Sequence, residues 1–126
     1  MIRCVAAAVF GCALSLPLAA QAERTFTAAA LRGEVVFGTP PQITLNGKPA
    51  RLAPGARIRD ENNLQHLPAT LVGRKVVVNY TTELEGLVLD VWMLSRDEAA
   101  RKPWPTSDQQ AREWHFNPDA QAWTKP

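Results

Sequence analysis

The stretch ITLNGKPARLAPGARIR, residues 43–59, decides the fold expected for this chain. It opens with a hairpin signal, because Asn46-Gly47 lies between two runs in which apolar and polar residues alternate. A type I′ turn needs a positive φ at both central residues, which asparagine and glycine adopt most easily. A two-residue loop then pairs Leu45 with Lys48, Thr44 with Pro49 and Ile43 with Ala50. The core face expected from this register consists of Ile43, Leu45, Ala50 and Leu52.

Three arginines occupy outward positions along the second half of the stretch. Pro54-Gly55 predicts a second turn, because proline presets φ and glycine adopts the positive φ of a type II turn. The alternation then places Arg51, Arg57 and Arg59 outward. Such a pattern is typical of a solvated face whose charges protect a strand edge. The same arginines are also the first candidates for contacts with an anionic ligand.

Three further strands are expected around this hairpin, at residues 31–37, 75–80 and 87–94. The last is the longest apolar run, and both of its faces are largely apolar, which indicates burial on both sides. Asp90 interrupts it, and we expect an outward carboxylate that forms an ion pair with an arginine or lysine of a neighbouring strand. The inward residues predicted for the three strands are Leu31, Gly33, Val35, Phe37, Val76, Val78, Tyr80, Leu87, Leu89, Val91 and Met93.

The C-terminal part predicts short helices and a small hairpin. Ser95 with Glu98 forms a capping-box pattern that opens a helix through Lys102, and Ser107 begins a second helix of the same kind. Residues 114–116 and 122–124 flank a type I turn at residues 117–120. The tryptophans of this hairpin are expected to cover the exposed face near Trp92. The alternative is a mobile aromatic tail that recognises a partner.

The central segment resembles small exported bacterial OB-like β-barrel domains of unknown function. The pattern that carries the resemblance covers residues 31–94 and consists of Gly33-x-Val35, Ile43-x-Leu45-Asn46-Gly47, Arg51-Leu52, Ala56-x-Ile58, Leu71-Val72-Gly73-x-x-Val76-x-Val78, Gly86 and Val88-x-x-Val91. It implies a mainly all-β fold, a small OB-like or SH3-like antiparallel β-barrel. With the C-terminal elements, this barrel carries a short helical segment and a terminal hairpin. The resemblance supplies no catalytic residue.

The first 22 residues have the features of a cleavable signal peptide. Arg3 precedes an uncharged stretch that is too short for a membrane span of about 20 residues, and Ala20-Gln21-Ala22 fits the signal-peptidase pattern with cleavage after Ala22. We therefore expect a periplasmic protein with a barrel domain at residues 23–102 and a Pro- and Trp-containing extension at residues 103–126 that packs on the barrel. Both cysteines, Cys4 and Cys12, precede the cleavage site, so the mature chain has no disulfide. Loss of Arg3 also lowers the formal net charge from +2 to +1, which gives no support to global steering toward nucleic acid.

Few residues suit catalysis or metal binding. His66 and His115 lie in unrelated segments, whereas a zinc site needs three or four ligands at constrained spacing. Ser95 and Ser107 fit helix caps better than activated nucleophiles. The sequence contains no G-x-S-x-G, phosphate-binding loop or dinucleotide motif. We therefore predict no cofactor, no metal and no enzymatic activity.

Two binding functions and one enzymatic function remain. The first is an exported accessory module that acts on another envelope protein or cell-wall component through its sheet edge or aromatic tail. The second is an OB-type binder of an anionic oligosaccharide or other polyanion, nucleic acid being the least expected ligand of an exported protein. The third is a hydrolase whose site the spacing does not reveal. The candidate binding residues are Arg51, Arg57, Arg59, Trp92 and Trp104.

Overall fold

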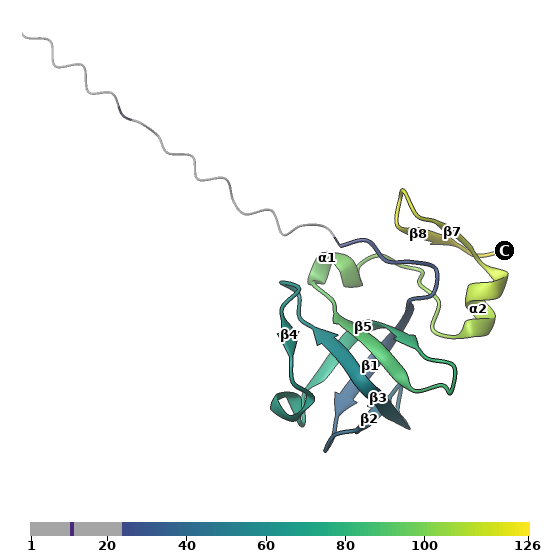
Figure 1. Ribbon diagram of the computed structural model, residues 1–126. Helices are drawn as coiled ribbons and strands as arrows, with labels where there is room; N and C mark the ends of the chain where they lie inside the picture. The colour runs from purple at the N-terminus through teal and green to yellow at the C-terminus, as the bar shows by residue number, and fades with distance from the viewer. Residues whose placement is uncertain (1–10, 12–23) are drawn as a thin grey trace, which may run out of the picture.

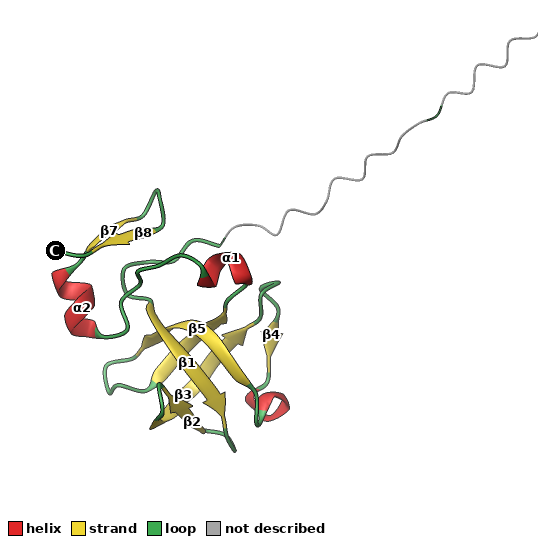
Figure 2. Cartoon of the chain, turned by 180° about the vertical axis from the view of Figure 1, so that it is seen from behind, coloured by secondary structure: helices red, strands yellow, loops and turns green. Residues whose placement is uncertain are grey.

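The computed structural model describes Gly11 and residues 24–126, which form a small β-barrel with short helices and a hairpin at its periphery (Figures 1 and 2). The predicted signal peptide and its cleavage at Ala22 lie outside the described residues. No helix in the described part of the chain is long and apolar enough to cross a membrane. The elements in chain order are β1 (Leu31–Phe37), β2 (Gln42–Leu45), β3 (Lys48–Arg59), β4 (Gln65–His66), the 3₁₀ helix η1 (Pro68–Leu71), β5 (Lys75–Thr82), β6 (Val88–Met93), α1 (Arg96–Ala99), α2 (Asp108–Glu113), β7 (His115–Asn117) and β8 (Ala122–Thr124).

Five strands close into the barrel in the order β1-β5-β6-β3-β2, and β2 pairs back with β1. This confirms the mainly all-β barrel predicted from the alternating segments. The pairing differs from the expectation in one respect, because β3 runs parallel to β6 while the other barrel pairs are antiparallel. Parallel strands are connected by long crossovers and not by tight turns, so no turn motif in the sequence predicts this pairing. The short β4 pairs antiparallel with the end of β3, along the edge opposite β6.

The hairpin of β2 and β3 has the predicted register. Leu45 pairs with Lys48, Thr44 with Pro49 and Ile43 with Ala50. Asn46 and Gly47 have φ values of 53° and 80°, as a type I′ turn requires. The pairing of β3 with β6 begins only at Leu52. Pro49 therefore lies where β3 pairs on one side alone, which suits a residue without an N–H group.

Pro54-Gly55 does not form the predicted second turn. Both residues lie inside the twelve-residue strand β3, and the positive φ of Gly55, 77°, bends this strand instead of reversing it. The register with β6 shifts between Leu52 and Arg57 at this bend. A strand that pairs with β2 in its first half and with β6 in its second must curve around the barrel, and irregular positions provide that curvature.

The inward face of β6 also differs from the prediction. Val88 and Val91 are each 1% exposed, whereas Leu89 is half-buried and Leu87 precedes the strand. Val88 pairs with Thr82 while Asp90 pairs with Thr81, so Leu89 is the extra residue of a bulge. The bulge reverses the alternation, which explains why Val88 replaces the predicted Leu87 and Leu89 in the core. The buried residues of the barrel core are Leu31, Val35, Phe37, Ile43, Leu52, Ile58, Leu71, Val78, Tyr80, Val88, Val91 and Met93.

A second group of buried side chains, here called the aromatic cluster, lies outside the barrel where the N-terminal and C-terminal segments pack together. Its buried members are Phe26, Ala30, Leu94, Trp104 and Trp123, with Trp92, Ala99, Ala111, Trp114 and Phe116 partly buried against them. The rings meet mostly edge to face, as in the 5.5 Å contact between the centroids of Phe26 and Trp92. The aromatic residues of the tail are therefore packed near Trp92, as expected, and recognition of a partner by this segment stays a prediction.

The helices begin where the sequence predicts and the first ends early. Ser95 and Glu98 form both hydrogen bonds of a capping box, and Ser107 caps α2. Helix α1 stops at Ala99 and does not reach Lys102. Lys102 precedes a proline, which disfavours helical backbone there. The carbonyl oxygens of Ala99 and Arg101 instead accept hydrogen bonds from the guanidinium of Arg32.

Candidate functional site

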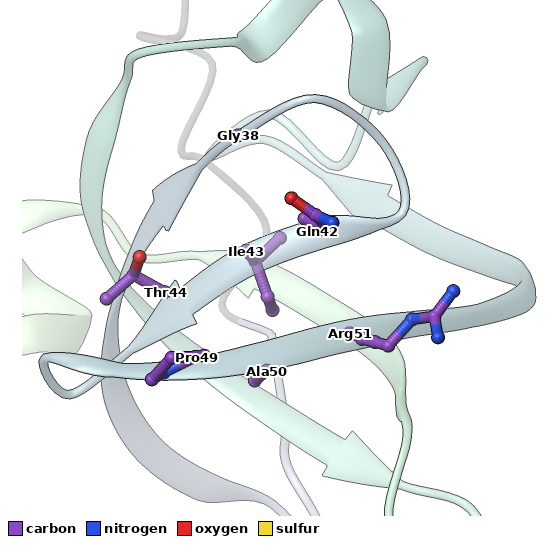
Figure 3. Close-up of a pocket in the computed structure, with 7 residues that line it drawn as sticks. All are labelled: Gly38, Gln42, Ile43, Thr44, Pro49, Ala50 and Arg51. Atoms are coloured by element: carbon purple, nitrogen blue, oxygen red, sulfur yellow. The ribbon is translucent and has the colours of Figure 1, made fainter.

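The outer side of the β2–β3 hairpin forms a shallow groove of about 620 Å³. Figure 3 shows it, with Thr44 and Pro49 toward the turn and Gln42 and Arg51 toward the other end. We call it the β2–β3 groove, and the residues that line it are Gly38, Gln42, Ile43, Thr44, Pro49, Ala50 and Arg51.

The register of the hairpin sets the spacing of the polar side chains in this groove. Gln42 lies directly opposite Arg51, and Thr44 directly opposite Pro49. Hydrogen-bonded and non-hydrogen-bonded pairs alternate along an antiparallel ladder, and both of these pairs are of the non-hydrogen-bonded kind. Their side chains therefore lie close together. Among the described residues, the side chains of Gln42, Thr44 and Arg51 take part in no hydrogen bond or ion pair. The groove thus presents an amide, a hydroxyl and a guanidinium group that remain available to a ligand.

The loop between β1 and β2 closes one end of the groove. The Gly38 N–H donates to the carbonyl oxygen of Gln42 over 3.1 Å, and the Leu52 N–H donates to the carbonyl of Pro41 over 2.8 Å. A Cβ atom at Gly38 would lie 3.2 Å from that same Gln42 oxygen, which is tighter than ordinary contact. The loop is therefore held against β3, and the end of the groove is built from backbone.

Arg57 lies farther along β3 and is already paired. Its Nε donates to Oδ1 of Asp90 over 3.0 Å, and Oδ2 of Asp90 accepts a hydrogen bond from the Thr81 hydroxyl over 3.1 Å. This confirms the ion pair expected for Asp90 with a neighbouring strand. Asp90 neutralises the guanidinium, so Arg57 offers less to an anion than Arg51 does.

The other predicted binding residues lie away from the groove. Arg59 is half-buried and lies beside Trp92 of β6 in the parallel register. Trp92 packs on Phe26, and Trp104 is 4% exposed with its indole N–H donating to the carbonyl of Ala30 over 2.9 Å. Both tryptophans therefore belong to the aromatic cluster. The structure does not bring Trp92 or Trp104 together with Arg51, because the outward face of β6 is covered by the terminal segments.

The histidines play no part in the groove. His66 Nε2 lies 2.7 Å from Oδ2 of Asp60, and that contact, with N–H donors from the backbone of Leu64 and Asn62, lowers the pKa of the Asp60 carboxyl. This arrangement holds the loop between β3 and β4. His115 is exposed on β7. Across the part of the chain that the structure describes, no three histidine, cysteine or acidic side chains lie close enough to hold a metal ion.

Gln42 and Thr44 are the two groove residues that sequence reasoning did not single out. Both were recognisable as outward positions of the predicted hairpin, Thr44 from its pairing with Pro49 and Gln42 from its pairing with Arg51 two residues along. The arginines were predicted from their charge, whereas Gln42 and Thr44 are uncharged. In the hairpin register, the Gln42 amide lies beside Arg51.

Comparisons of the chain with protein-family models, with curated protein sequences and with solved structures gave no match.

Proposed function

We propose that this protein is an exported binding module of the cell envelope and that the β2–β3 groove holds its ligand, an anionic oligosaccharide of the envelope. The observation that carries the proposal is the set of polar side chains in the groove, Gln42, Thr44 and Arg51, which have no partner among the described residues. Barrels of the OB type commonly bind extended ligands across the face of their second and third strands and the adjoining loops. The groove occupies that position here.

The chemistry of the groove supports a ligand with hydroxyl groups and one acidic group. Gln42 and Thr44 both donate and accept hydrogen bonds, which suits sugar hydroxyls. Arg51 supplies a planar, permanently charged fork for a carboxylate or phosphate. Pro49 adds an apolar surface opposite Thr44, at the turn end of the groove. Within the described part of the chain, no histidine, cysteine, lysine or carboxylate lines the groove, so no neighbouring base would activate the Thr44 hydroxyl as a nucleophile, which suits a binding role.

The packed tryptophans make the alternative mode of action, capture of an envelope protein by the tail, less favourable. Trp104 and Trp123 are 4% and 5% exposed, so they would have to leave the aromatic cluster before they reached a partner. The groove needs no such rearrangement.

The test compares capture of acidic and neutral envelope oligosaccharides by the immobilised protein. Arg51→Gln removes the charge and should weaken capture of the acidic fragments about tenfold, as expected for one exposed charge-assisted hydrogen bond. Gln42→Ala should weaken both classes. Salt should weaken acidic capture in the parent protein, since charges at about 0.5 M ionic strength are screened within a few ångströms.

Arg57→Gln is the matched control, because it removes another exposed arginine of the same strand, which Asp90 already neutralises. Equal losses from Arg51→Gln and Arg57→Gln would show that the ligand responds to the general charge of β3 and would refute the groove as the site. Failure of the parent protein to bind any oligosaccharide would refute the ligand class.

A further inference from the structure

A second hollow lies on another part of the surface, between β1 and the segment after α1. It has a volume of about 540 Å³ and shares no residue with the β2–β3 groove. We call it the Arg32 crevice, and its lining consists of Arg32, Lys102, Pro103, Trp104 and Thr106.

Arg32 forms the floor of this crevice and is only 8% exposed. Its Nε donates to Oδ1 of Asn79 over 2.8 Å, and its two terminal nitrogens donate over 3.3 Å to three backbone carbonyls at the end of α1. Its guanidinium carbon lies 5.2 Å from the ring centroid of Trp104. All of these acceptors are uncharged. Four of the five guanidinium N–H groups are used in this way, which leaves one N–H free and the positive charge unneutralised.

The nearest carboxylate does not balance that charge. Glu98 is bound by Arg24, whose Nε and Nη2 donate to its two oxygens over 3.0 and 2.5 Å. Lys102 adds a second positive charge to the lining of the crevice, and Arg101, which lies outside the lining and donates to the carbonyl oxygen of Arg24 over 3.5 Å, adds a third positive charge nearby. The pKa of Arg32 is lowered to about 10, first by burial and then by repulsion from Arg101, and the attraction of Glu98 offsets only part of this. Positive charge therefore gathers at the crevice, while the nearby carboxylate, Glu98, is already paired with Arg24.

We propose that the Arg32 crevice binds a small anionic group, a phosphate ester or a carboxylate, that Arg32 and Lys102 contact and that the nearby charge of Arg101 attracts. Lys102 is exposed at the rim and brings three N–H donors on a flexible stem. Pro103 and Trp104 form apolar walls that would contact the carbon skeleton bearing the anion. A buried, partly satisfied guanidinium beside an indole face is well suited to such a group, because the low local dielectric strengthens each charged hydrogen bond.

The test measures thermal denaturation of the full mature protein in inorganic phosphate, citrate or chloride at matched ionic strength. Anions that bind the native state raise its melting temperature. We expect phosphate or citrate to raise it above the value in chloride. Lys102→Gln should weaken binding at least tenfold in titration calorimetry, and Arg101→Gln should weaken it less, because Arg101 lies outside the lining. Stabilisation by phosphate identifies a phosphate ester as the natural chemistry, and stabilisation by citrate alone identifies a carboxylate.

Arg57→Gln serves as the matched control and should respond to the anions as the parent protein does, because Asp90 already pairs with Arg57 and this arginine lines neither the Arg32 crevice nor the β2–β3 groove. Lys102 is exposed, so Lys102→Gln keeps the test informative even if Arg101→Gln disturbs the fold. Equal melting temperatures in all three salts would overturn the proposal. So would an anion effect that both variants retain in full.

Discussion

The ion pair between Arg24 and Glu98 should be the most sensitive polar contact of the protein. Arg24 lies in the segment before β1, and its guanidinium donates to both oxygens of Glu98 and to the carbonyl oxygens of Asp60 and Met93. The two side chains are only 11% and 8% exposed. The pair therefore ties the N-terminal segment to the loop after β3, the end of β6 and helix α1.

Arg24→Gln removes the charge while preserving much of the side-chain volume. Glu98 would keep the capping-box bond from the Ser95 N–H but would remain a buried carboxylate without a cation. Breaking a buried ion pair by removing one partner costs about 3–5 kcal/mol. With a urea slope of roughly 1.5 kcal/mol per M, this lowers the unfolding midpoint by about 2–3 M.

The measurement is urea unfolding followed by tryptophan fluorescence, because four tryptophans report on the packed state. Arg57→Gln is the comparison, since it breaks a pair of the same chemistry whose arginine is 51% exposed. The Asp90 side chain is itself 14% exposed, but water reaches the pair from the side of Arg57 and the hydrogen bond from the Thr81 hydroxyl remains. The loss should therefore stay near the value of about 1 kcal/mol for exposed pairs, which is a midpoint shift of roughly 0.7 M. If the two variants had the same midpoint, burial would not determine the strength of these pairs and the reasoning would be wrong.

Two further predictions concern the ionisation of Glu98 and the bulge in β6. Burial opposes ionisation of Glu98, but the hydrogen bonds from Arg24 and Ser95 outweigh it and hold the pKa of Glu98 below the usual 4.5. The stability that this group contributes is therefore complete above pH 4.5 and declines as the pH falls through the lowered pKa. Glu98→Gln should flatten the fall in unfolding free energy between about pH 5 and pH 3, and an unchanged slope would contradict the assignment. Val91→Asp should prevent folding or cost several kcal/mol, since Val91 is 1% exposed. Leu89→Asp should leave the circular dichroism spectrum intact, because the bulge keeps Leu89 out of the core. Equally severe losses of stability in the two variants would contradict the bulge at Leu89.

Local signals explain why so much of the barrel was predictable. The turn at Asn46-Gly47 fixes the register of β2 with β3, and that register determines which side chains face the core. Likewise, the capping pattern of Ser95 and Glu98 involves residues three apart, so a sequence displays it directly. Each of these features depends on neighbours along the chain.

The features that the sequence did not reveal depend on residues far apart. Arg32 has an outward position on β1, and only the terminal segments that cover it make it buried. The parallel pairing of β3 with β6 and the bulge at Leu89 arise from closing the barrel, which no local pattern encodes. The β2–β3 groove was half recognisable, since Arg51 was a candidate but Gln42 gave no charge signal. The distinction between Arg51 and Arg57 required the position of Asp90.

The bonds between Phe26 and Gln121 bear on when the protein can complete its fold. Gln121 is 8% exposed, and its amide accepts from the Phe26 N–H over 2.7 Å and donates to the Phe26 carbonyl over 3.1 Å. These residues lie 95 positions apart, near opposite ends of the chain. The aromatic cluster therefore cannot close until Gln121 has left the ribosome, whereas every strand of the barrel is synthesised earlier. Until then the backbone of Phe26 lacks both of these hydrogen bonds, so the N-terminal segment gains its final packing only when the C-terminal hairpin docks.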